Sequence, residues 1–441
     1  MVKGISRQVI VVHSPDPKLF EQAIFILKDN AVGEGITDEA LLKEAQKAIH
    51  TGDRAKKRRH LYLYGAVWAA GGALLTGLTW LITVLFLGCE ATRFVIQSPI
   101  LLRAAGCRPR EIFPADEVRV LRIGTIEVKN PVFLAPMAGV TDWAFRTVCA
   151  ELGAGVTVTE MVSSRALVYR DQKSAKLLRK NPGSVCGAQI FGNDPDTMAE
   201  GARLALEISG CDFLDINMGC PMPKVANNGD GCGLMRTPEL AGKIVEAVVK
   251  AVDVPVTVKC RLGWDKGSIN VLDFTRRMED SGAAMVAVHG RTRSMLYSGT
   301  ADWDAIHKVK EQLTIPVIAN GDITGGEAAV RCLKRTGADG LMIGRSVFGD
   351  PWIFQEVNAA LAGKVYAGRP CLKDRVAVAV RQFQLAEEDH GEHIACLEAR
   401  KHFAWYLKGV PHSGYYKNQI SSLTTMEDIY RVAKDVVRDL T

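Results

Sequence analysis

The residues with the clearest chemical potential lie in the stretch Asp215-Ile216-Asn217-Met218-Gly219-Cys220-Pro221. The apolar run Phe213–Ile216 predicts a short buried strand, and Gly219 and Pro221 predict a turn directly after it. In α/β folds a residue held on a turn beyond a strand end faces ligand rather than core. Cys220 is therefore a candidate reactive thiol, although most cysteines in a chain act as small buried apolar residues.

Polar residues follow other apolar runs in the same way. Asn320-Gly321-Asp322 and Gly344-Arg345 follow the last two runs, and the corresponding loops of a barrel commonly bind phosphate. Lys259 and His289 end two earlier runs, and the amide of Gln189 can both donate to and accept from a ring edge such as a flavin pyrimidine. Taken singly, these residues also fit rim ion pairs or a structural histidine. Together they predict a site for a flat, phosphorylated cofactor.

The elements that must position these residues form a repeating pattern from Leu121 onward. Short apolar, β-branched runs alternate with amphipathic stretches of helical length, which is typical of an α/β protein of the (β/α)8 TIM-barrel class. A doubly wound sheet is the alternative, but no G-x-G-x-x-G opens a helix after the first strand. The predicted strands are Val132–Ala135, Val156–Thr159, Val185–Ile190, Phe213–Ile216, Val256–Lys259, Met285–His289, Val317–Asn320 and Gly340–Ile343. The predicted helices include Pro195–Ile208, Pro238–Val252, Val271–Ser281, Ile306–Gln312 and Gly326–Thr336.

A C-terminal helical domain, residues 370–441, is predicted to follow a barrel domain at 121–360. Helical periodicity covers Val376–Asp389, Ile394–Leu407 and Met426–Leu440, with a break at His412-Ser413-Gly414. A basic and aromatic cluster in this tail can hold phosphates and stack on a base, or it can be a solvated helix face around a core tryptophan. The members of this cluster are Arg400, Lys401, His402, Trp405, Lys408 and Lys417.

The composition excludes several classes of protein. A hydrophobic fraction of 47% with 24% charged residues is globular rather than disordered, and the chain has room for about two or three domains. The cysteines number 11 and form no CxxC pair, which argues against a disulfide framework or any metal site and for a reducing, cytoplasmic compartment. The formal net charge of +6 does not by itself indicate a nucleic-acid partner.

Residues 1–120 do not follow the barrel pattern. In the small segment 1–60, Val9–Val12 and Phe20–Leu27 are expected to form a strand-and-helix unit without a catalytic motif. Residues 62–88 are uncharged and follow a basic stretch, and about 20 apolar residues span a bilayer, so this run is a candidate transmembrane helix and membrane contact. The basic flank should stay cytoplasmic, which would place the rest of the chain outside and conflicts with a cytoplasmic catalytic part. A buried helix, an interfacial hairpin and a joined neighbouring reading frame are the alternatives, with 89–120 as a linker.

From about residue 121 to the C-terminus the chain resembles the tRNA-dihydrouridine synthase family, and most closely its B-type bacterial members. The resemblance rests on motifs that occur in the family's order and extend over the whole barrel. They are Ala135–Asp142, Gln189–Gly192, Asp215–Pro221, Lys224-Val225, His289–Arg293, Ile318–Asp322 and Met342–Arg345. The resemblance does not cover residues 1 to about 118, and Cys232 stands where the family's pattern leads us to expect a small residue such as serine or alanine.

The resemblance implies an enzyme that reduces the 5,6 double bond of specific uridines in tRNA, with FMN as cofactor and NADPH as reductant. Cys220 would be the catalytic acid and Asn217 would help to hold the uracil. Arg291, Arg400 and Lys401 are also expected to bind the tRNA substrate. The residues expected to bind FMN are Pro136, Met137, Ala138, Gln189, Lys259, Asn320, Gly321, Asp322, Gly344 and Arg345, and His289 is expected at the same mouth.

The required chemistry agrees with the residue types. Reduction of a uridine needs a hydride and a proton, and since no side chain donates hydride, a cofactor must supply it. A loop thiol such as Cys220 can supply the proton if it stays protonated at rest. Two other functions are consistent with parts of the sequence. One is an FMN barrel oxidoreductase that acts on a small pyrimidine, but such an enzyme does not need the helical tail. The other is a membrane-tethered RNA- or flavin-binding protein without turnover, but such a protein does not need an acid at Cys220.

Overall fold

The computed structural model describes residues 9–13, 22–26 and 120–441. The chain divides into two units, Met1–Arg108 and Pro109–Thr441. In the first, strand β1 (Val9–His13) pairs antiparallel with strand β2 (Gln22–Ile26). The expected helix at Phe20–Leu27 is therefore wrong: its central residues Ile24, Phe25 and Ile26 are β-branched or aromatic, which favours a strand. The candidate transmembrane run 62–88 lies outside the described residues, among which no helix is long and apolar enough to cross a membrane.

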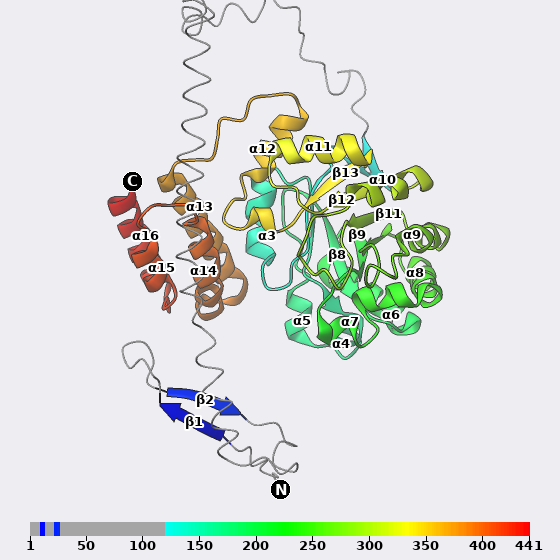
Figure 1. The fold of residues 1–441 in the computed structure, drawn as a ribbon, viewed down its shortest axis with the longest axis horizontal. Coiled ribbons are helices and arrows are strands. Elements are labelled where there is room, and N and C mark those ends of the chain that lie inside the picture. The colour runs from blue at the N-terminus through cyan, green and yellow to red at the C-terminus, as the bar shows by residue number, and fades with distance from the viewer. Residues whose placement is uncertain (1–8, 14–21, 27–119) are drawn as a thin grey trace, which may run out of the picture. The chain divides into compact units, whose positions relative to one another are not determined.

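Eight parallel strands in the second unit close into a barrel (Figure 1). Strand β6 pairs with β5 on one side and with β8 on the other, and this second pairing joins the two ends of the eight-strand series. This closure confirms the predicted TIM-like barrel and excludes the doubly wound sheet. The strands are β5 (Val132–Leu134), β6 (Val156–Val158), β8 (Val185–Phe191), β9 (Phe213–Met218), β10 (Val256–Cys260), β11 (Met285–His289), β12 (Val317–Asn320) and β13 (Gly340–Ile343).

Helices cover the outside of this barrel, and all five that the sequence predicted are present with small shifts at their ends. Side chains that point outward from the strands, such as Leu214, Ile216 and Val258, pack against this helical layer in one continuous apolar core. The main helices of the layer are α3 (Trp143–Glu151), α6 (Pro195–Ser209), α8 (Pro238–Ala251), α9 (Val271–Asp280), α10 (Trp303–Gln312), α11 (Gly326–Thr336) and α12 (Ile353–Leu361).

An antiparallel hairpin that the sequence analysis missed closes the amino-terminal end of the barrel. It consists of β3 (Leu121–Ile123) and β4 (Ile126–Val128), joined by a turn in which Gly124 has a φ of +56°. A Cβ at Gly124 would lie 2.8 Å from Pro255, so both the backbone conformation and the close packing require glycine. Leu121, Ile123 and Val128 pack against apolar side chains inside the barrel, which leaves the opposite, carboxyl-terminal mouth as the open end.

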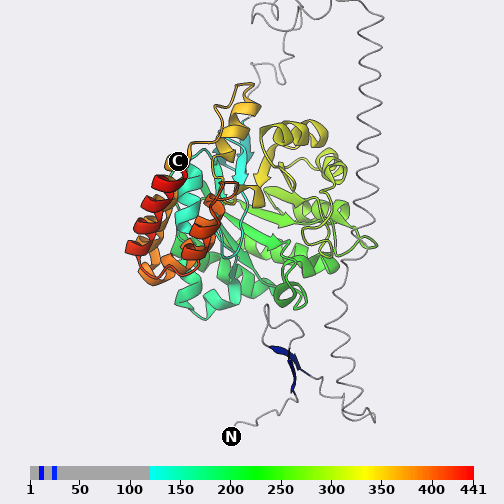
Figure 2. The same cartoon turned by 60° about the vertical axis from the view of Figure 1, so that its left-hand side comes forward.

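The C-terminal tail forms the predicted helical bundle beside helix α3, as Figures 1 and 2 both show. Its helices are α13 (Leu372–His390), α14 (Glu392–Tyr406), α15 (Gly414–Ile420) and α16 (Met426–Leu440). The short helix α15 begins at the predicted break and was not expected. The bundle has its own apolar core, which includes Phe383, Phe403 and Ile429. It joins the barrel through aromatic contacts, since Trp405 stacks on Phe348 with ring centroids 4.3 Å apart.

Candidate active site

Cys220 lies at the open mouth of the barrel, on the turn that follows β9. The side-chain oxygen of Asn217 accepts hydrogen bonds from the backbone amides of Cys220 at 2.9 Å and Gly219 at 3.2 Å. The Cys220 carbonyl accepts a further bond from the amide of Cys232 at 3.1 Å. Burial raises the pKa of the half-exposed Cys220 thiol, although Arg261 and Lys259 oppose the rise. The turn is thus fixed from two sides and holds a protonated thiol at neutral pH.

A buried chain of polar side chains runs across the barrel beneath this turn. Asn217 donates to the side-chain oxygen of Gln189 at 2.9 Å, and Gln189 donates to the Asp215 carboxylate at 2.6 Å. Thr257 donates to the other oxygen of Asp215 at 2.5 Å. Burial raises the pKa of Asp215 to about 6. These bonds fix the orientation of the Gln189 amide and use only one of its two N–H groups, so the other N–H can serve a ligand.

Lys259 provides a positive charge at the same mouth. Its ammonium donates to the side-chain oxygen of Asn320 at 3.1 Å, and Asn320 donates in turn to the Met342 carbonyl at 2.7 Å. No carboxylate of the described residues forms an ion pair with Lys259, and burial together with Arg261 lowers its pKa to about 8. Burial, reinforced by nearby cations, also lowers the pKa of His289, which is therefore neutral. The barrel mouth thus has an excess of positive charge, which suits an anionic ligand.

Arg291 and Asp322 form a structural ion pair in the loops after β11 and β12. Arg291 is 2% exposed, and its guanidinium donates to both oxygens of Asp322 at 2.8 Å. It also donates to the carbonyls of Ser298 at 3.0 Å and Gly299 at 2.7 Å. The sequence led us to expect a substrate contact from Arg291 and an FMN contact from Asp322. In the structure both side chains bond to each other, and Arg291 also bonds to the backbone, so the pair fixes the shape of these loops.

Two residues that the sequence analysis did not include, Arg261 and Tyr297, also line the mouth. Arg261 donates to the Gly219 carbonyl at 2.9 Å, and so supports the Cys220 turn. Tyr297 is 50% exposed, with the guanidinium of Arg261 5.7 Å and that of Arg345 4.7 Å from its ring centroid. Arg261 could have been found from the sequence, because it follows Lys259 closely at the end of a predicted strand. Tyr297 could not, because it lies in a long loop without a distinctive pattern.

The loop Pro136-Met137-Ala138 lies beside Gly344-Arg345, because β5 and β13 are neighbours and the Ala135 amide donates to the Ile343 carbonyl at 2.8 Å. Thr141 accepts from the Met137 amide at 2.9 Å, and Asp142 caps helix α3 by accepting from the Phe145 amide at 2.8 Å. Ala138 and Arg345 are exposed. The structure therefore brings the predicted cofactor-binding residues from the first, third, fifth, sixth, seventh and eighth barrel strands to one mouth.

The basic and aromatic cluster of the tail is largely engaged in packing. Arg400 donates twice to the Leu423 carbonyl, at 2.9 and 2.7 Å, and Lys401 donates to the Gly139 carbonyl in the barrel. His402 is 1% exposed between the rings of Phe145 and Trp405, and burial lowers its pKa to about 3. Lys408 is exposed and Lys417 half-buried. Lys401 therefore links the bundle to the rim of the site, whereas His402 and Trp405 belong to the domain contact.

The residues present fit a flat, phosphorylated cofactor better than a metal ion. In the described part of the chain no group of three or more histidine, cysteine or acidic side chains is placed to hold a metal. By contrast, the Lys259 ammonium has no carboxylate partner in residues 120–441, and Gln189 has one N–H group that bonds to no protein atom there. The rim is also open at Gly344, where an added Cβ would have only Ala135 near it, at 4.0 Å. These donors match the phosphate and ring edge of a flavin nucleotide.

The same part of the chain is similar to known proteins. The family model described as Dihydrouridine synthase (Dus) matches residues 133–440. Over 305 residues the chain is 41% identical to tRNA-dihydrouridine synthase B of Pasteurella multocida, an alignment that covers 69% of this chain and 92% of the relative. It is 46% identical over 283 residues to a probable tRNA-dihydrouridine synthase of Rhizobium leguminosarum, covering 64% and 87%. The chain belongs to the dihydrouridine synthase family of enzymes.

Proposed function

We propose that this protein is a tRNA-dihydrouridine synthase that uses FMN and NADPH to reduce the 5,6 double bond of uridines in tRNA. The observation that supports this most directly is the protonated thiol of Cys220, held on a fixed turn at the mouth of a barrel that also presents the unpaired ammonium of Lys259. A pure binding protein has no need of an acid in that place, and the relatives named above are synthases of this kind by name.

The cofactor would be held by residues from several strand ends. Gln189 and Lys259 would contact the ring system of FMN, and the loops at Asn320-Gly321-Asp322 and Gly344-Arg345 would bind its phosphate through backbone amides and the exposed guanidinium of Arg345. The loop Pro136-Met137-Ala138 would pack beside the ring, next to Gly344. FMN held there would supply the hydride that no side chain can supply.

Cys220 would donate the proton in this reaction. Its Sγ hydrogen is retained at neutral pH because burial raises the thiol pKa, and a retained proton is what a general acid needs. Asn217 would hold the thiol in place through the backbone amide of Cys220 and would contribute to the uracil contacts. The exposed ring of Tyr297, with Arg261 and Arg345 beside it, is suited to contact with a flat base.

The C-terminal bundle would bind the tRNA body. Lys401, which reaches the barrel rim at Gly139, and the exposed Lys408 are its best placed cations for phosphate contacts. Arg400 would act mainly by fixing the turn at Leu423 that connects α15 and α16. Binding of tRNA gives the helical tail a function, whereas an oxidoreductase that acts on a free pyrimidine would not need such a tail.

The experiment that tests this function compares two substrates. Full-length protein is purified, its visible spectrum is recorded, and NADPH oxidation is followed with tRNA that lacks dihydrouridine or with free uracil and uridine. The proposal expects a flavin spectrum and dihydrouridine in the tRNA alone. Turnover of the free pyrimidines without modification of the tRNA would instead identify a small-molecule reductase.

A further inference from the structure

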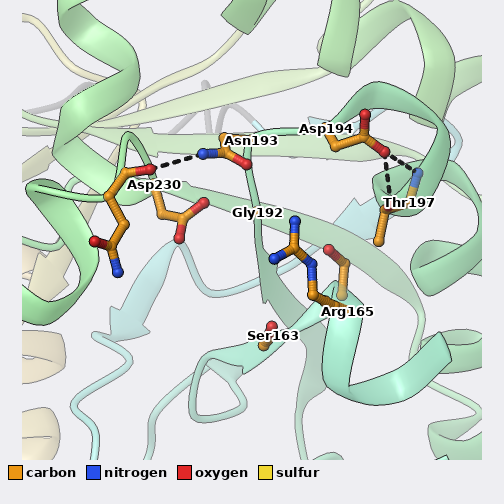
Figure 3. Close-up of a pocket in the computed structure, with 9 residues that line it drawn as sticks. Ser163, Arg165, Gly192, Asn193, Asp194, Thr197 and Asp230 are labelled. Atoms are coloured by element: carbon orange, nitrogen blue, oxygen red, sulfur yellow. Dashed lines mark hydrogen bonds between the residues drawn. The ribbon is translucent and has the colours of Figure 1, made fainter. Parts of the chain in front are cut away.

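A second polar pocket lies on the same rim of the barrel as Cys220 and has no part in the chemistry described above (Figure 3). Its volume is about 210 Å³, below the roughly 300–1,000 Å³ of pockets for drug-sized ligands, so it is suited to a single ring system. The lining comes from the ends of β7 (Val162–Ser163) and β8 and from the loop after β9, and it contains no large apolar side chain. It includes Ser163, Arg165, Asn193, Asp194, Asn228 and Asp230.

Most of the polar groups in this lining already have partners in the protein. Asp194 caps helix α6 by accepting from the Thr197 amide at 2.8 Å and the Thr197 hydroxyl at 2.5 Å. Asn193 donates to the Asn228 carbonyl at 2.8 Å, which joins the β8 end to the loop after β9. These bonds build the walls of the pocket and reduce the number of groups that are available to a ligand.

Arg165 and Asp230 are the charged groups that remain. Figure 3 shows the guanidinium of Arg165 and the carboxylate of Asp230 facing each other across the pocket. Within residues 120–441, neither side chain forms a hydrogen bond or an ion pair within 4.0 Å. The pocket therefore presents a strong donor and a strong acceptor on opposite walls. That pairing suits a nucleobase edge, since arginine donates to guanine O6 and N7 and a carboxylate accepts from an exocyclic amine.

The pocket adjoins the reactive turn. Asp230 directly precedes Gly231, and a Cβ at Gly231 would lie 3.1 Å from the Cβ of Cys220. The next residue, Cys232, donates its backbone amide to the Cys220 carbonyl. One wall of the pocket is therefore continuous with the loop that holds the acid. A chain of nucleotides that places one base at Cys220 can place a neighbouring base in this pocket.

We propose that this pocket binds the base of an unpaired nucleotide adjacent to the target uridine, read by Arg165 and Asp230. The inference rests on the proposed action on RNA. Unpaired bases are the usual targets of sequence-specific RNA recognition because their hydrogen-bonding edges are free. The pocket thus helps to select which uridine is reduced, whereas the reduction itself takes place at the barrel mouth beside Cys220.

The test uses full-length protein and unmodified tRNA transcripts. The modified uridine is first mapped, and each flanking nucleotide is then replaced by the other three bases. Binding of each transcript and kcat/KM for dihydrouridine formation are measured for the wild type, Arg165→Ala, Asp230→Asn and Arg122→Ala. Arg122 is a matched control because it is an exposed arginine on the hairpin at the opposite end of the barrel.

The proposal expects the wild type to discriminate about tenfold or more between bases at one flanking position, as a good bidentate base contact does. Arg165→Ala and Asp230→Asn should abolish this discrimination with an unchanged rate of flavin reduction by NADPH, and Arg122→Ala should retain it. Equal loss of affinity for all bases in Arg165→Ala would indicate a phosphate contact and overturn the assignment, as would retained discrimination. A wild type that binds transcripts with base preference but forms no dihydrouridine would overturn the proposed function and leave the pocket standing.

Discussion

The side-chain oxygen of Asn217 accepts a hydrogen bond from the backbone amide of Cys220 at 2.9 Å, while the amide nitrogen of Asn217 donates to Gln189 at 2.9 Å. One side chain therefore fixes both the turn that presents the acid and the amide expected at the cofactor ring. This relationship joins the two halves of the proposed chemistry, and the geometry of Asn217 can be tested separately from the thiol itself.

Asn217→Ala should lower the rate of dihydrouridine formation about ten- to hundredfold, since an unsatisfied buried polar group costs about 1–3 kcal/mol and each 1.36 kcal/mol changes a rate tenfold. Flavin should remain bound because Lys259 and the phosphate loops are unchanged. Single-turnover assays with pre-reduced protein measure this effect. Asn418→Ala, at an exposed position on α15, is the control and should have wild-type activity. An unchanged rate in Asn217→Ala would remove the residue from the account.

Two arginines on the same rim should respond differently to substitution. Arg291→Ala leaves Asp322 without its partner and should lower the free energy of unfolding by about 2–3 kcal/mol. This loss is smaller than for a fully buried ion pair because Asp322 is partly exposed to water. Arg345→Ala should leave stability unchanged and weaken flavin binding about tenfold or more through loss of a charge-assisted hydrogen bond. Thermal denaturation and flavin titration separate the two effects. Equal stability losses would show that Arg345 is structural as well.

Flavin affinity should depend on pH through Lys259, whose pKa burial lowers to about 8. Below that pH the ammonium is charged and attracts an anionic ligand, so affinity should be nearly constant. Above it, binding must take up a proton, and affinity should fall by up to about tenfold for each pH unit. Lys259→Gln should bind flavin more weakly and without this dependence. Fluorescence titration across the range tests the prediction, and an identical pH profile in both proteins would refute it.

Asp142 should make stability depend on pH in the opposite direction from an ordinary helix cap. Burial and the carboxylate of Glu398 raise its pKa from 3.8 to about 7. The folded carboxyl therefore holds its proton more tightly than the unfolded one, and the resulting stability is present at low pH and lost as pH rises to about 7. Asp142→Asn retains a cap without a charge.

The melting temperature of Asp142→Asn should accordingly exceed that of the wild type by more at about pH 8 than at about pH 5. The control is Asp171→Asn in helix α5 (Gln172–Lys176), an exposed cap whose pKa is lowered by its bonds to Ser174. That substitution removes a favourable charge and should give no gain at higher pH. A gain of equal size at both pH values in Asp142→Asn would contradict the assignment of a buried, protonated carboxyl.

The barrel could be predicted from the sequence because each strand is a short β-branched run that ends in a glycine- or polar-rich loop. Residues at strand ends, such as Gln189, Cys220 and Lys259, were found for the same reason: their place follows from the period of the fold. The hairpin at Leu121–Val128 was missed because exposed charged residues, Arg122 and Glu127, interrupt its two short strands, so no apolar run marks them.

The sequence could not show which side chains contact one another in the folded protein. Arg291 and Asp322 are 31 residues apart, and only the folded loops bring them together and commit them to each other. His402 and Trp405 are residue types found in nucleic-acid contacts, yet both pack against the barrel: His402 is buried against Phe145, and Trp405 is half-buried on Phe348. The pocket between Arg165 and Asp230 likewise needs three loops that are distant along the chain.

Cys220 is proposed to supply the proton in a reduction carried out on tRNA. The most direct measurement is single-turnover formation of dihydrouridine in unmodified tRNA by flavin-reduced protein, comparing the wild type, Cys220→Ala and the exposed control Cys371→Ala. We expect dihydrouridine with the wild type and the control. In Cys220→Ala we expect the rate to fall about a hundredfold or more, with flavin still bound and still reduced by NADPH. Full activity in Cys220→Ala would contradict the claim.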